Sequence, residues 1–291
     1  MHLYINISQK SGKVVFDIIS SANMNFNANN NVPYLTFKSL ECDKDFFLAV
    51  STRHGGVSTL PECASMNLGT STQDKWENVV ENYRIFCQGA GLDINRLVLA
   101  KQTHSANVRL VTDKDAGKGV LKERDYTDVD ALITNVADLP LVIHTADCVP
   151  VAFVDTKNKA IGNAHCGWRG TFDKLAQKTF VEMNKSFGTK ADDLKVFIGP
   201  CICMDCYEVS KELYMQFMEK FGYDEYIVQK DGKYYLNLPY INKQILIDEG
   251  VPSENIVVSV VCTCCNKDHL FSHRGLGPKR GIQGTFLQIC S

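Results

Sequence analysis

The sequence predicts an α/β protein built around one large domain. Strand-like and helix-like runs alternate from Phe46 to the C-terminus, and no internal repeat interrupts them. The chain has 291 residues and a hydrophobic content of 45%, which is that of an ordinary globular protein. We therefore expect a single domain over 34–291. A short strand and an Asn-rich, turn-forming segment, together residues 1–33, would precede it.

Strands are predicted where β-branched, aromatic and other apolar residues form short runs. These runs are 46–51, 97–100, 107–111, 131–134, 141–145, 149–154, 160–164, 196–198 and 256–261. The polar turn at 156–159 joins two of them and predicts a hairpin. Cys148 and His165 stand at its two far ends, so antiparallel pairing would bring them together.

Amphipathic periodicity predicts three helices in the second half of the chain. The first covers 171–187, with Thr171 as its N-cap and Gly188 as its stop. The others cover 206–221 and 238–249. The loop 167–170 precedes the first helix, so the free N–H groups of that helix would lie at the mouth of a site.

Charge and hydropathy argue against several classes of function. The chain carries 31 basic and 33 acidic residues, a net charge of -2, which gives no field to recruit nucleic acid or an anionic membrane. No stretch approaches the roughly 18 apolar residues of a membrane span, and the N-terminus lacks the pattern of a signal peptide. We expect a cytoplasmic protein, a monomer or small homo-oligomer, that acts on a small molecule.

Twelve cysteines without an export signal indicate reduced thiols, some of them metal ligands. Two clusters in the last third of the chain would allow a second, structural Cys-rich metal site. They are Cys201-x-Cys203-x-x-Cys206 and Cys262-x-Cys264-Cys265. Because their spacing matches no common zinc motif closely, buried or reduced thiols are the preferred interpretation, and metal binding there stays open.

Three potential metal ligands, His104, Cys148 and His165, lie at the ends of predicted strands. Zinc prefers imidazole and thiolate, and a catalytic zinc takes three protein ligands with a fourth position left open. Each residue also has an ordinary structural interpretation. A histidine beside a strand is commonly part of the core, and a single cysteine commonly behaves as a small buried hydrophobe.

Short motifs spread along most of the chain add a family resemblance. They are Thr-Arg-His-Gly-Gly-Val-Ser at 52–58, Met-Asn-Leu-Gly at 66–69, Asn-Tyr-Arg at 82–84, Gln-Thr-His at 102–104, Asp-Ala-Leu-Ile-Thr at 130–134, Ala-Asp-Cys-Val-Pro at 146–150, Ala-His-Cys-Gly-Trp-Arg-Gly at 164–170, Ile-Gly-Pro-Cys-Ile at 198–202, Tyr-Glu-Val at 207–209 and Cys-Thr at 262–263. In this order they resemble the YfiH/YlmD family, once called laccase-domain or polyphenol-oxidase proteins. The resemblance implies an α/β (α+β) fold of layered mixed sheets flanked by helices, similar to the cytotoxic necrotising factor fold.

The resemblance also implies a metal and an activity. It implies zinc, with copper as the alternative, bound by His104, Cys148 and His165. It implies phosphorolysis of inosine, adenosine and methylthioadenosine to base and sugar 1-phosphate, together with adenosine deamination. This chain departs from the family at Cys166, where alanine is usual, and at His144 before the Ala-Asp-Cys motif. Both residues are additional potential ligands.

Other residues are candidates for binding substrate or for acid–base chemistry. Arg53, in its Gly-containing turn, and Arg169, beside the predicted helix start, would bind phosphate, although Arg53 also fits an ordinary turn with a surface arginine. Asp147 would act as a general base or as a carboxylate that orients a histidine. Gln102 and Cys201 would complete the pocket.

Three rival functions remain open. Cys148 would be a nucleophile, with His104 or His165 as its base, in a hydrolase acting on an amide such as a peptidoglycan precursor. A copper polyphenol oxidase fits less well because the chain has no His-x-His pair. A non-catalytic binding protein would use zinc only for stability.

Overall fold

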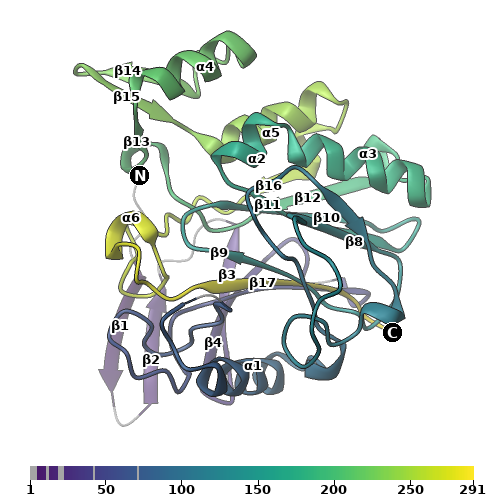
Figure 1. The fold of residues 1–291 in the computed structure, drawn as a ribbon, viewed down its shortest axis with the longest axis vertical. Coiled ribbons are helices and arrows are strands. Elements are labelled where there is room, and N and C mark those ends of the chain that lie inside the picture. The colour runs from purple at the N-terminus through teal and green to yellow at the C-terminus, as the bar shows by residue number, and fades with distance from the viewer. Residues whose placement is uncertain (1–4, 11–12, 19–22, 42, 71) are drawn as a thin grey trace.

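The computed structural model describes residues 5–10, 13–18, 23–41, 43–70 and 72–291. Two six-stranded sheets stack face to face, and helices cover the outer face of each (Figure 1). The α/β prediction is therefore confirmed, in the layered form of mixed sheets flanked by helices. No helix in this part of the chain is both long enough and apolar enough to cross a membrane.

Each large sheet mixes parallel and antiparallel strands. The first has the order β16 (Ile256–Val258), β12 (Leu194–Ile198), β10 (Val149–Asp155), β11 (Ala160–Cys166), β8 (Ala131–Thr134), β7 (Val108–Leu110). The second has the order β3 (Met24–Asn29), β4 (Val32–Phe37), β5 (Phe46–Ser51), β17 (Gln283–Ile289), β9 (Leu141–Thr145), β6 (Val98–Leu99). Smaller sheets pair β1 (Ile5–Lys10) with β2 (Lys13–Ile18), and β15 (Lys233–Leu236) with both β13 (Glu208–Val209) and β14 (Ile227–Lys230).

The helices lie on opposite sides of the stacked sheets. Those on the first sheet are α2 (Trp168–Phe172), α3 (Leu175–Phe187) and α5 (Leu238–Asp248), with α4 (Lys211–Phe221) beside the small sheet of β13 to β15 (Figure 1). Helix α1 (Trp76–Ala90) covers the second sheet, and the short α6 (His273–Leu276) precedes β17. Short 3₁₀ turns occur at Ile94–Arg96, Asp113–Asp115, Ala191–Asp193, Met204–Cys206 and Ser253–Asn255.

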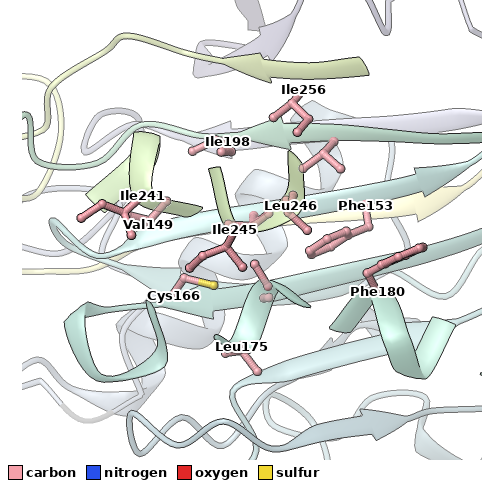
Figure 2. Packing of buried hydrophobic residues seen from close by; sticks show 14 of the residues in the cluster. Val149, Phe153, Cys166, Leu175, Phe180, Ile198, Ile241, Ile245, Leu246 and Ile256 are labelled. Atoms are coloured by element: carbon pink, nitrogen blue, oxygen red, sulfur yellow. The ribbon is translucent and has the colours of Figure 1, made fainter. Parts of the chain in front are cut away.

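The core follows from the two-residue period of the strands. On β10, Val151 and Phe153 face the helices, whereas Ala152 and Val154 face the second sheet. Figure 2 shows Phe153 close to Phe180 of α3 within the helix-side cluster. Both faces of β10 are buried, which explains its uninterrupted apolar sequence.

The predicted hairpin forms and fixes the position of two candidate ligands. Strands β10 and β11 pair antiparallel with Pro150 opposite His165 and Val149 opposite Cys166. Because side chains alternate between faces, His165 points to the face opposite that of Cys166. Cys148 shares the parity of Pro150, so it lies on the same side of the hairpin as His165.

Two helix predictions need correction. The expected helix 171–187 is broken after Phe172, since Lys174 adopts a left-handed φ of 56° before α3 begins. Thr171 is therefore no N-cap: it is buried within α2, and its hydroxyl donates to the Cys166 carbonyl at 3.2 Å. The expected helix 206–221 begins only at Lys211, because a 3₁₀ turn and β13 come first and Ser210 provides the N-cap. Helix 238–249 is confirmed to within one residue.

The Asn-rich segment is mostly strand and not turn. Its residues 24–29 form β3, which pairs antiparallel with β4, and Asn30 and Asn31, both at positive φ, form the turn between these strands. Asparagine fits this edge strand because its amides bond across the pair, Asn27 to Thr36 at 2.7 Å and Asn29 to Tyr34 at 3.0 Å. Residues 21 and 22 of the segment lie outside the described residues. Helix α1 was not predicted at all.

Asn163 of β11 joins the two stacked sheets, and this contact predicts a loss of stability. Its buried amide donates to the carbonyls of Leu141 at 3.1 Å and Thr285 at 2.9 Å. Asn163→Ala removes both bonds and leaves buried acceptors, so urea denaturation should show a loss of about 1–3 kcal/mol. The exposed control Gln229→Ala should change the free energy of unfolding by less than about 0.5 kcal/mol. Equal effects of the two substitutions would contradict the assignment.

Candidate metal centre

The structure brings His104, Cys148 and His165 together where the β10–β11 hairpin leaves the sheet. One ligand atom from each residue lies within 4.8 Å of the others. Cys148 Sγ is 4.0 Å from His104 Nε2, and the two imidazole rings lie 4.9 Å apart at 72°. His104 reaches the site from the loop between β6 and β7, on the second and first sheets respectively. We call these three residues the triad.

A fully buried carboxylate, Asp130, organises two of the three triad residues. It accepts a hydrogen bond from His165 Nδ1 at 2.8 Å, which leaves His165 Nε2 as the atom available to a metal. It also accepts from the backbone N–H of His104 at 3.1 Å and of Ser105 at 2.9 Å. His104 has a left-handed φ of 65°, so its loop needs such anchoring.

The buried charges support one another. Burial alone would raise the pKa of Asp130, but the bond and charge of His165 and the backbone N–H donors bring it down to about 2. Burial would also raise the pKa of Cys148, but the charge of His165 and the contact with His104 lower it to about 6. The lowered pKa favours the thiolate, which is the form of cysteine that binds metals.

Position 167, beside the triad, requires glycine because the space there does not admit a side chain. A Cβ at this position would lie 3.0 Å from Cys148 Sγ and 3.0 Å from His104 Cδ2. The Gly-Trp-Arg-Gly turn therefore lets the backbone pass directly against two candidate ligands.

The two additional potential ligands point elsewhere. Cys166 lies in the helix-side core near Leu175 and Ile245 (Figure 2), and burial raises the pKa of its thiol. His144 bonds to the hydroxyl of Tyr83, and burial lowers the pKa of its imidazole to about 3. Neither belongs to the triad, because the alternation along β11 and the Tyr83 contact direct them away.

Two cavities of different character open at the triad. The larger, about 710 Å³, is lined by all three triad residues and by four cations: Lys101, Arg124, Lys279 and Arg280. The smaller, about 340 Å³, is lined by His104 and Cys148, by Trp168, Tyr207 and Leu238, and at polar positions by Asp147, His273 and Arg274. Arg280 lines both cavities. The triad therefore lies between a strongly cationic cavity and a mixed one that contains two aromatic side chains.

The arginines expected to bind phosphate lie outside both cavities. Arg53 donates to the carbonyls of Ala64 at 3.0 Å and Lys267 at 2.8 Å, so its guanidinium joins two loops. Arg169 stacks on Trp168, 4.2 Å from the ring centroid. By contrast, Arg280 has a buried Nε with no hydrogen-bond partner in the described part of the chain.

Gln102 and Asp147 position backbone around the triad. The amide of Gln102 both donates to and accepts from the backbone of His144, at 2.7 and 2.8 Å, and the residue lines the larger cavity. The carboxylate of Asp147 accepts from Thr263 Oγ1 and from the N–H of Arg274, each at 2.6 Å. The carboxylate that bonds a triad histidine is thus Asp130, whereas Asp147 ties the Cys148 turn to the 263–274 segment.

Cys201 is buried and lines a third cavity, which no triad residue lines. The sequence reasoning missed Asp130 and Arg280. Asp130 had a readable signal, since an acidic residue directly precedes a predicted strand that neighbours the hairpin. Arg280 had none, because only the path of the chain into β17 brings it beside Cys148.

Comparison with known proteins identifies the family. The family model described as multi-copper polyphenol oxidoreductase laccase matches residues 47–290. The chain belongs to this laccase-domain family. A purine nucleoside phosphorylase of Bacteroides thetaiotaomicron is 35% identical over 252 residues, covering 85% of this chain and 93% of that protein. Adenosine deaminase RL5, of an unknown prokaryotic organism, is 32% identical over 237 residues, covering 80% and 90%.

The crystal structure of the hypothetical protein YfiH of Bacillus licheniformis has the same fold. Its TM-score is 0.84 at 29% identity, and the match covers 91% of this chain and 98% of that one. The YfiH/YlmD resemblance is confirmed. This laccase-domain protein is an enzyme, as its curated relatives are. The family description and the triad both indicate metal binding.

The contacts of Asp130 predict its effect on metal affinity. Asp130→Asn keeps the size of the side chain but places an amide N–H against N–H donors, so it should loosen both His104 and His165. Metal affinity, measured by competition with a chromophoric chelator, should fall about 10–100-fold. The control is Asp113→Asn, whose exposed carboxylate accepts from Arg96 at 2.7 Å, away from the loop that carries His104. Unchanged affinity in Asp130→Asn would contradict the role of this carboxylate.

Proposed function

We propose that this chain is a zinc-dependent purine nucleoside enzyme. It would cleave inosine, adenosine and methylthioadenosine with phosphate, giving base and sugar 1-phosphate, and it would also deaminate adenosine. The names of the relatives support the substrate class. The observation that carries the proposal is the triad between a cationic cavity and an aromatic one. Phosphorolysis needs both surfaces, since phosphate and nucleoside must meet at the anomeric carbon.

Arg280 is the proposed phosphate ligand. Its buried Nε lacks a partner in the described residues, and a guanidinium matches the geometry of a phosphate oxygen pair. Arg124 and Lys101 line the same cavity and would add positive charge. Arg53 and Arg169, the arginines expected from sequence, would act indirectly, Arg53 through its loop and Arg169 through Trp168.

The purine would lie in the smaller cavity. Trp168 and Tyr207 offer flat aromatic surfaces, and Leu238 adds an apolar contact. In the proposed reaction a phosphate oxygen bonds to C1′ as the bond from C1′ to the purine nitrogen breaks. The proton of hydrogen phosphate ends on the released base, so charges and atoms balance.

The proposed metal is zinc, held by His104, Cys148 and His165. Two imidazoles and a thiolate suit zinc, and the two cavities leave space for a further ligand from outside the chain. The same set occurs in blue-copper centres, which add an axial methionine. No methionine lines either cavity among the described residues. When bound, zinc would supply Lewis-acid polarisation of an oxygen atom.

A Cys–His hydrolase is the second candidate. It is favoured by the contact of Cys148 with His104 and by the lowered pKa of the Cys148 thiol, which are features of an activated nucleophile. Metal content separates the two candidates, because a thiolate bound to zinc is a poor nucleophile. We further propose that the enzyme works in the cytoplasm, as a monomer or small homo-oligomer, which agrees with its many reduced thiols.

The test of the proposed function is product analysis. Protein of known metal content is incubated with inosine or adenosine, with and without phosphate, and the products are separated chromatographically. Base and sugar 1-phosphate should appear only with phosphate, and adenosine should also yield inosine. His104→Ala should reduce turnover at least about 100-fold. Arg280→Gln should raise the KM for phosphate about 10-fold or more, as expected for the loss of a charged hydrogen bond.

The control is Arg84→Gln, on the exposed face of α1, which should leave the turnover and the KM for phosphate unchanged. Absence of base release and of deamination in zinc-loaded protein would overturn the proposal. Amide hydrolysis by metal-free protein, abolished in Cys148→Ser, would instead establish the second candidate.

A further inference from the structure

Two Cys-x-x-Cys pairs meet on the side of the molecule where the 3₁₀ turn Met204–Cys206 approaches the segment that follows β16. The pairs are Cys203 with Cys206, and Cys262 with Cys265, and we call them the cysteine quartet. Their four sulfur atoms all lie within 4.8 Å of one another. Cys201 and Cys264, which accompany them in sequence, are not part of this group. When Cys201 and Cys264 are counted with the clusters, the equal Cys-x-x-Cys spacing of the two pairs is not apparent in the sequence.

The spacing of the sulfurs fits a single tetrahedral ion. Zinc–sulfur bonds of about 2.3 Å hold the sulfurs of a tetrahedral site roughly 3.8 Å apart. In this chain Cys206 Sγ and Cys265 Sγ are 3.5 Å apart. A multi-iron cluster places several metal atoms between its thiolates and would hold them farther apart.

Backbone N–H groups already point at one of the sulfurs. Cys262 Sγ accepts from the N–H of Cys203 at 3.3 Å and from the N–H of Cys265 at 3.4 Å. Such donors favour the thiolate form of Cys262. One donor comes from each Cys-x-x-Cys pair, so the backbone of both pairs lies against this sulfur. The four sulfurs are therefore close together, and one of them, Cys262 Sγ, also accepts hydrogen bonds from the backbone.

The two loops are held in register independently of the sulfurs. The N–H of Cys201 donates to the Val261 carbonyl at 3.2 Å, and the N–H of Thr263 donates to the Cys201 carbonyl at 3.0 Å. These bonds form a parallel bridge between Cys201 and Cys262. A quartet carried by paired backbone is preorganised, so little conformational entropy opposes metal binding.

We propose that Cys203, Cys206, Cys262 and Cys265 bind a second, structural zinc ion. Four protein thiolates complete a tetrahedral shell and leave no position for substrate, which is the arrangement of a structural site. Thiol protons would pass to solvent on binding. Three of the four, Cys203, Cys262 and Cys265, line another cavity of about 240 Å³, and no member of the quartet lines either cavity at the triad. The proposal does not depend on the nucleoside chemistry.

The zinc would stabilise one wall of the smaller triad cavity. Arg274 donates to the carbonyls of Cys206 at 3.1 Å and Glu208 at 2.9 Å, while its own N–H donates to Asp147. Tyr207, adjacent to Cys206, also lines that cavity. Crosslinking the two loops through a metal would therefore hold Tyr207 and Arg274 in place beside Cys148.

The test is a metal count on intact protein purified under reducing conditions with zinc present. Cys206→Ser together with Cys265→Ser should lose one zinc ion per chain relative to the unsubstituted protein, and should melt at a lower temperature. Cys264→Ser, between two proposed ligands, is the matched control and should keep the full zinc content. His104→Ala should retain the quartet zinc whatever happens at the triad, which separates the two sites.

A second measurement requires no substitution. Iodoacetamide labelling with a non-thiol reductant present, mapped by peptide mass spectrometry, should modify the quartet slowly in zinc-loaded protein and at least about 10-fold faster after chelation. Cys264 should react equally in both. Unchanged zinc content in the double variant, iron in place of zinc, or equal quartet labelling before and after chelation would each overturn the proposal.

Discussion

The buried carboxylate of Asp130 is the constraint on which the site depends. A fully buried charge needs several donors, and here they come from His165 and from the backbone of residues 103–105. Those donors belong to two of the three segments that carry the triad. The same bonds therefore offset the desolvation free energy of the buried Asp130 carboxylate, orient His165, and hold His104 in its left-handed conformation.

The sheets explain how Asp130 reaches this position. Strand β8 pairs with β11 so that Ala131 lies opposite Ala164, which places Asp130 beside His165. On the other side of the hairpin, Asp147 joins the Cys148 turn to Thr263 and Arg274. Two carboxylates thus tie the end of one hairpin to loops distant in sequence. Two cavities of different character open between these loops, so the fold places two unlike surfaces at the triad.

Local patterns predicted much of the fold because strand and helix periods are local properties. The hairpin around 156–159 could be read from its apolar runs and polar turn, and it correctly placed Cys148 near His165. The errors arose where tertiary contacts override propensity. Asparagines in β3 bond across to β4, and a left-handed Lys174 separates α2 from α3 although the amphipathic pattern continues through it.

The sequence by itself determined the α/β class, the hairpin and, through its motifs, the family and three candidate ligand positions. Tertiary structure alone decided which other residues join them. His165 meets Asp130 across 35 positions, and Cys206 meets Cys265 across 59. Arg280 reaches both cavities, whereas Arg53 is engaged with loop carbonyls. The physical reason is that strand order and loop paths, which depend on burial over the whole chain, have no signature in a local window.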